Sequence, residues 1–114
     1  MNYDKAHGLA SAMRESDEYK KLMEAQEEVK KDEDALGMVR QFLTLQMQWE
    51  YSKMANSEEE PELMKKLQDL TLLVNNNSNA RNYLQAYTYW SQVSQDIYRI
   101  ISEPITEGMS LLEK

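Results

Sequence analysis

The sequence predicts an all-α fold: a helical bundle of about five helices, two of them long, in a single domain over residues 1–114. Only three glycines and two prolines interrupt the 114 residues, so the chain has few obligatory turns. No run of four to eight residues alternates apolar and polar side chains in the manner of a strand between hairpin turns. Apolar side chains recur instead every three or four residues, which is the spacing of one helix face.

The first three helices are expected at about 3–14, 17–30 and 33–55. Ser16 and Asp32 stand just before the second and third helices. A short polar side chain at such a position accepts a hydrogen bond from an open amide group of the first turn, so both residues are interpreted as N-caps.

Each of these helices carries an apolar stripe. On the first helix it consists of Ala6, Leu9, Ala10 and Met13, and on the third of Ala35, Met38, Val39, Phe42, Leu45 and Trp49. The second helix has opposite charges four residues apart, so we expect ion pairs between Asp17 and Lys21 and between Glu27 and Lys31.

A loop at 56–61 leads to the fourth helix, with Pro61 in its first turn. Its stripe has the four-three-four spacing of a coiled-coil seam and consists of Leu63, Leu67, Leu70 and Val74. The asparagine-rich stretch 75–79 ends it, and Ser78 is expected to cap a fifth helix over about 79–103. Proline lacks an amide hydrogen, so Pro104 should end or kink this helix, leaving a turn or two in the remaining residues.

The fifth helix bears an extended aromatic and aliphatic stripe, made of Tyr83, Tyr87, Trp90, Ser94, Ile97 and Ile101. A helix of about 25 residues is about 37 Å long, whereas a compact chain of this size has a radius of gyration of only about 13 Å. One copy therefore has few elements with which to cover two long stripes. We expect an intertwined or closely packed homodimer, in which core and interface coincide, with interface candidates Phe42, Leu45, Trp49, Tyr83, Tyr87, Trp90, Ile97 and Ile101.

Charge and composition narrow the functional classes. The net charge is −7, and the paired lysines sit among acids, so we expect no direct nucleic-acid partner. No apolar run approaches the roughly 20 residues that span a bilayer, and no secretory signal opens the chain. With no cysteine, disulfides and thiolate metal sites are excluded in the chain alone. We therefore expect a cytoplasmic protein with no membrane partner.

The sequence also lacks a recognisable catalytic motif. His7 is the only histidine and is read as a surface or packing residue, so neither a catalytic triad nor the Glu-x-x-His repeat of di-iron bundles is present. Residues 58–60 could at most hold calcium weakly. We predict no catalytic, metal or cofactor-binding residues and no enzymatic activity. The alternative is a carboxylate-based metal-binding helical-bundle enzyme, and a third hypothesis is amphipathic membrane association of the fifth helix.

The order and spacing of these elements resemble a known family. Residues 9–46, LASAMRESDEYKKLMEAQEEVKKDEDALGMVRQFLTLQ, are similar to the small helical proteins of the YlbF/YmcA/YheA family. The similarity lies in Glu18-Tyr19-Lys20 at a helix start, in Asp32 at a helix end, and in the segment 42–46. The ending IYRIISEPITEGM at 97–109 resembles the YheA-like branch.

The resemblance implies a self-associating helical protein of the bacterial cytoplasm that acts as a non-enzymatic regulator, with other regulatory proteins as partners. Better-known relatives belong to a complex that affects RNA processing by an endoribonuclease, and through it competence, sporulation and biofilm formation. Those relatives carry cysteines associated with iron–sulfur clusters. This chain has none, which separates it from that cluster chemistry.

Overall fold

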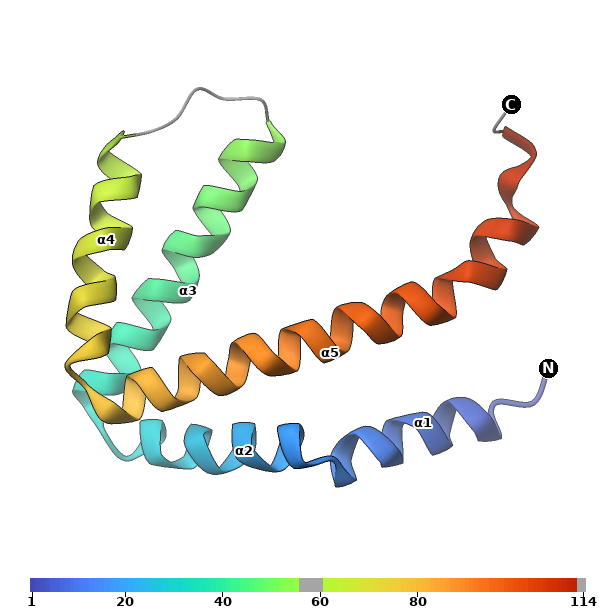
Figure 1. Ribbon diagram of the computed structural model, residues 1–114, viewed down its shortest axis with the longest axis horizontal. Coiled ribbons are helices and arrows are strands. Elements are labelled where there is room, and N and C mark those ends of the chain that lie inside the picture. The colour runs from blue at the N-terminus through green and yellow to red at the C-terminus, as the bar shows by residue number, and fades with distance from the viewer. Residues whose placement is uncertain (56–60, 113–114) are drawn as a thin grey trace.

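A computed structural model describes residues 1–55 and 61–112, and α-helices dominate both segments (Figure 1). The helices are α1 (Asp4–Glu15), α2 (Asp17–Lys30), α3 (Glu33–Met54), α4 (Pro61–Asn75) and α5 (Ser78–Gly108), followed by a short 3₁₀ helix, η1 (Ser110–Leu112). The predicted all-α class and its five helices, with α3 and α5 the longest, are confirmed. The predicted dimer stays a prediction. The acidic stretch 58–60 lies outside the described residues.

Two predicted caps form where the sequence places them. The Tyr19 amide donates to Ser16 Oγ at 3.3 Å at the start of α2. The Ala35 amide donates to Asp32 Oδ1 at 3.1 Å at the start of α3. These bonds satisfy donors that a helix start leaves without partners, so the boundaries of α2 and α3 follow from local chemistry.

The predicted cap of α5 is wrong by one residue. Asn77, not Ser78, is the N-cap: its backbone is extended, and its Oδ1 accepts the Ala80 amide hydrogen bond at 3.0 Å. Both residue types can cap a helix, so the sequence alone does not discriminate between neighbours. Ser78 is instead the first residue of α5.

Helix α5 does not end near residue 103; of the two effects predicted for Pro104, an end or a kink, the structure shows the kink (Figure 1). The helix runs through Pro104 to Gly108, and its C-terminal end turns away from the axis of the long first part (Figure 1). Proline cannot donate the hydrogen bond that the Ile100 carbonyl would accept in a regular helix. Ile100 is 60% exposed, so water can hydrate that carbonyl and the helix continues.

The ion pairs of α2 differ from those predicted. Lys30 Nζ lies 3.4 Å from Glu27 Oε1, and Lys31 Nζ lies 3.7 Å from Glu28 Oε1, so both pairs span three residues instead of four. The predicted pairs Asp17–Lys21 and Glu27–Lys31 are not formed. All these side chains are solvent-exposed, and pairs of this kind contribute at most about 1 kcal/mol.

The helices form two arms that meet at one corner (Figure 1). One arm is the α3–α4 pair, and the other is α2 packed along the first half of α5, with α1 extending beyond α2. The molecule measures 47 × 39 × 15 Å. A helix with its side chains is about 10–12 Å across, so the chain is little more than one helix thick. Its radius of gyration is 18.0 Å, and the helices do not close into a bundle within one copy.

The buried core sits at the corner where the arms meet. It consists of Val29, Ala35, Val39, Leu70, Val74 and Ala80. Ala35 and Ala80, at the starts of α3 and α5, are fully buried. Their small side chains allow the helices to approach closely at the corner. Away from it, Leu22 and Leu63 are the only buried side chains among the residues whose burial is described, so both arms depend on few internal contacts.

Candidate interaction surface

None of the eight predicted interface residues is buried within the chain. Seven are partly buried, and Ile101 is exposed. They divide between two places in the fold: three lie on α3 and five lie along α5. The structure therefore does not gather them into one site, and the two stripes run along different arms.

On α5, Tyr83 and Trp90 face α2, whereas Tyr87 lines the hollow shared by α3, α4 and α5. The rings of Tyr19 and Trp90 pack at a centroid distance of 5.4 Å, and those of Tyr83 and Tyr87 at 6.1 Å. Burial raises the pKa of the Tyr83 hydroxyl above its usual value, and the neighbouring Tyr87 adds to the rise. This half of the stripe is thus a shallow core between α2 and α5, which leaves the rings partly exposed.

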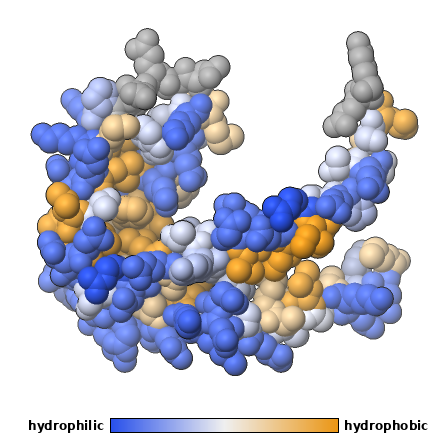
Figure 2. All heavy atoms as spheres, in the orientation of Figure 1, coloured by the Kyte–Doolittle hydropathy of each residue, from blue (hydrophilic) through white to orange (hydrophobic). Residues whose placement is uncertain are grey.

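The other two candidates, Ile97 and Ile101, lie beyond the part of α5 that α2 covers. Ile105, Met109 and Leu111 extend this apolar segment, and all three are exposed. Sequence reasoning missed them because it ended the helix at Pro104. Figure 2 shows apolar side chains gathered on the side of α5 that faces α1.

On α3, Phe42 and Leu45 pack against the edge of the corner core, whereas Trp49 lies further out along the arm. The Lys53 ammonium group stands 5.2 Å from the Trp49 ring centre, a cation–π contact at the surface. A second stripe on α3, which sequence reasoning missed, consists of the exposed residues Met47, Tyr51 and Met54. Their four-three spacing was a signal that could have revealed it.

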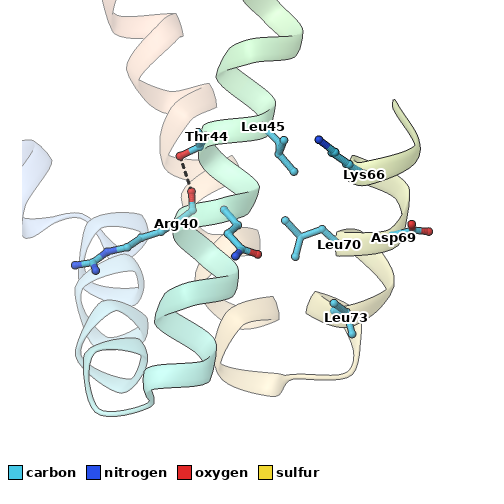
Figure 3. A pocket seen from close by; sticks show the side chains of 8 residues that line it. Arg40, Thr44, Leu45, Lys66, Asp69, Leu70 and Leu73 are labelled. Atoms are coloured by element: carbon cyan, nitrogen blue, oxygen red, sulfur yellow. Dashed lines mark hydrogen bonds between the residues drawn. The ribbon is translucent and has the colours of Figure 1, made fainter. Parts of the chain in front are cut away.

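Two hollows accompany these stripes. A groove of about 520 Å³ runs between α3 and α4, where Leu45 and Leu70 point toward each other while Arg40 and Asp69 point away (Figure 3). A wider hollow of about 1120 Å³ lies where α3, α4 and α5 meet and is lined in part by Phe42 and Leu84. Both are open, and neither holds a cluster of groups arranged for acid–base chemistry.

The described residues offer little to a metal ion. In residues 1–55 and 61–112, no three histidine, cysteine, aspartate or glutamate side chains come together as a possible ligand set. His7 is exposed on α1. Asp32 has a pKa below its usual value because its carboxylate accepts the Ala35 amide hydrogen bond and, next in importance, one from the side chain of Asn79 at 3.2 Å. These hydrogen bonds make Asp32 the N-cap of α3.

The fold and these exposed faces can be compared with known proteins. A model of the family described as "Control of competence regulator ComK, YlbF/YmcA" matches residues 2–106. The chain belongs to the YlbF/YmcA family. The resemblance recognised in the sequence is thereby confirmed over nearly the whole chain.

Proteins similar in sequence to this YlbF/YmcA-family chain have names that assign no activity. A "UPF0342 protein" of Staphylococcus saprophyticus is 32% identical over 105 residues, covering 92% of both chains. One of Clostridium tetani is 30% identical over 112 residues, covering 98% of this chain and 97% of its own. A third, of Caldicellulosiruptor saccharolyticus, is 32% identical over 114 residues.

A solved structure shares the fold. The "Protein of Unknown Function (DUF964) from Bacillus stearothermophilus" superposes with a TM-score of 0.72 at 22% identity, covering 92% of each chain. The open two-armed arrangement is therefore a fold found in another bacterial protein. In the part of the chain that the structure describes, no helix combines the length and the apolar character needed to cross a bilayer.

Proposed function

We propose that this protein is a non-enzymatic regulatory protein that works by binding other proteins, first of all a second copy of itself, through its exposed apolar helix faces. The observation that carries the proposal is the size of its surface. The chain exposes 9450 Å², whereas a compact monomer of 13.4 kDa exposes about 6500 Å². The excess is about 3000 Å² per copy.

An excess of this size is enough for permanent association, because two copies together expose about 6000 Å² more than two compact monomers would. Obligate homodimer interfaces bury about 2000–5000 Å² or more in total, counted over both partners, and they are more apolar than other protein surfaces. Each Å² of apolar surface removed from water contributes about 25 cal/mol, less the cost of association and of ordering the side chains. Exposed isoleucines, tyrosines and methionines on α3 and α5 supply apolar area of the required kind.

The family supports the regulatory part of the proposal. Its description names control of a competence regulator, which is a regulatory role. Nothing in the described residues favours the carboxylate-based metal enzyme, because no ligand set is assembled there. The chain has no cysteine, so an iron–sulfur cluster held by thiolates is not part of the proposal.

Light scattering on purified protein at tens of micromolar tests the self-association directly. The proposal expects a particle of twice the 13.4 kDa chain mass, whereas a strict monomer would reject it. Elemental analysis of the same sample tests the enzymatic alternative. A stoichiometric divalent metal that also raises stability when added would favour that alternative over a binding protein.

A further inference from the structure

The first helix has no adequate partner inside its own chain. α1 is 12 residues long, contains no buried residue, and among the described elements contacts only α2. An isolated helix of this length is marginal in water, and most helical stability comes from packing of an apolar face. Its stripe is incompletely covered: Ala6 and Leu9 are exposed, whereas Ala10 and Met13 are partly buried.

The second half of α5 is in the same situation. Facing residues on α2 and α5 keep a steady antiparallel register, with Tyr19 opposite Trp90 and Gln26 opposite Tyr83. Continued along the chain, this register would place residues 4–12 of α1 opposite residues 97–105 of α5. The backbones of the two segments separate: no described Cα atom of α1 comes within 8 Å of one in α5, although Ala10, Met13 and Ile97 are partly buried.

The second half of α5 diverges from α1, and apolar side chains of α5 lie on the side that faces the gap between them (Figures 1 and 2). On α5 the uncovered side chains include Ile101 and Ile105, the latter 57% exposed. The chain is only 15 Å thick, so no other part of it lies over this gap. Each copy thus presents two halves of a helix pair that are complementary in sequence register but unpaired in space.

The charges that flank the two stripes are also complementary. Lys5 and Arg14 border the apolar stripe of α1, one on each side, at helical spacing. Glu103 and Glu107 border the α5 stripe on the side of Ile100. None of these four side chains forms an ion pair with another described residue. Lys5 and Arg14 beside the α1 stripe and the two glutamates beside the α5 stripe would attract each other and favour this pairing over a like-with-like contact, although α1 as a whole is neutral because Asp4 and Glu15 offset its two cations.

We propose that, in the homodimer, α1 of each copy packs against residues 97–105 of α5 in the other copy. This inference rests on the proposed function, since it names the surface through which the chain self-associates. A two-fold axis forms the contact twice, and the two α1 helices and two α5 ends then enclose one apolar core as a four-helix arrangement. The exposed stripe at Met47, Tyr51 and Met54 on α3 stays outside this interface.

Charge substitutions on exposed residues test the location without disturbing the corner core. The double variant Ile101→Glu, Ile105→Glu should convert the dimer to a monomer at tens of micromolar. Most of the helical signal in far-UV circular dichroism should be retained, because α2–α4 stay folded. The matched control is Met47→Glu, Tyr51→Glu on α3, which alters two equally exposed apolar residues and should remain dimeric. If the control dissociates while the α5 variant stays dimeric, the interface lies on α3 and the inference is overturned.

Cross-linking gives an independent readout that needs no destabilising change. The chain lacks cysteine, so single replacements report one contact each. A mixture of Leu9→Cys and Ile101→Cys proteins should form a disulfide between the two different chains on mild oxidation, whereas Leu9→Cys mixed with Met47→Cys should not. A dimer with the reverse cross-linking pattern would sink the inference and leave self-association standing. A monomeric wild-type protein would instead reject the proposed function itself.

Discussion

Two leucines on α4, two residues apart, offer a matched test of the corner core. Leu70 is 6% exposed and belongs to the core, while Leu72 is 65% exposed on the outer face. Leucine-to-alanine changes at buried sites cost about 2–5 kcal/mol, depending on how far the site can collapse. The α3–α4 groove lies directly beside Leu70, so side chains can relax into the space. Leu70→Ala should therefore lose about 2–3 kcal/mol, in the lower half of that range.

Leu72→Ala should change the free energy of unfolding by no more than about 0.5 kcal/mol, as is usual for exposed positions. Urea denaturation followed by far-UV circular dichroism measures both variants. The difference corresponds to roughly 1–2 M in the midpoint for an ordinary dependence on urea. All samples need one protein concentration, because association couples stability to concentration. Equal losses of stability for the two variants would refute the reasoning, because the Leu72 side chain would then have to be buried by a second chain packed against α4.

Three further predictions concern single residues at the helix starts. Ser16→Ala removes the acceptor of the Tyr19 amide and should lower stability by about 1 kcal/mol in the same urea assay, with Ser16→Asn as the conservative variant that keeps most of it. The pKa of Asp32 is depressed by the hydrogen bonds from Ala35 and Asn79, so its stabilising effect is complete above the unfolded value near 3.8 and is lost as the pH falls through the folded value. The urea midpoint of the wild type should therefore fall more steeply than that of Asp32→Asn as the pH is lowered below 4. Parallel curves for the two proteins would contradict this. Ala35→Leu should overpack the corner and lower the free energy of unfolding by about 1–3 kcal/mol. An unchanged urea midpoint would show that the corner accommodates a larger side chain.

Local chemistry explains which parts of the fold the sequence could predict. Ser16 and Asp32 cap their helices because each is a short acceptor placed directly before a run of helical spacing. The same logic could not choose between Asn77 and Ser78, which offer equivalent acceptors one residue apart. Solvent decides the position of the end of α5, which the sequence also failed to predict. Pro104 is tolerated because the Ile100 carbonyl lies on an exposed part of the helix.

The arrangement of the arms could not be read from periodicity. A stripe such as Tyr83 to Ile101 indicates which face of the helix is buried by packing. It does not indicate whether α2, α1 or another copy of the chain packs against that face. The structure divides that stripe, with Trp90 against Tyr19 in the same chain and Ile101 left exposed. The division depends on where α1 and α5 separate, which is a property of helix crossing and not of either sequence segment.

Hydrogen exchange at the amides of residues 97–105, apart from Pro104, which has no amide hydrogen, tests the central claim most directly, because it measures whether a second copy covers the end of α5. We expect these amides in wild-type protein at tens of micromolar to exchange slowly, and to exchange rapidly in the Ile101→Glu, Ile105→Glu variant, while those around Val39 and Val74 stay protected in both. Rapid exchange at 97–105 in the wild type, or equal protection in the two proteins, would contradict the account.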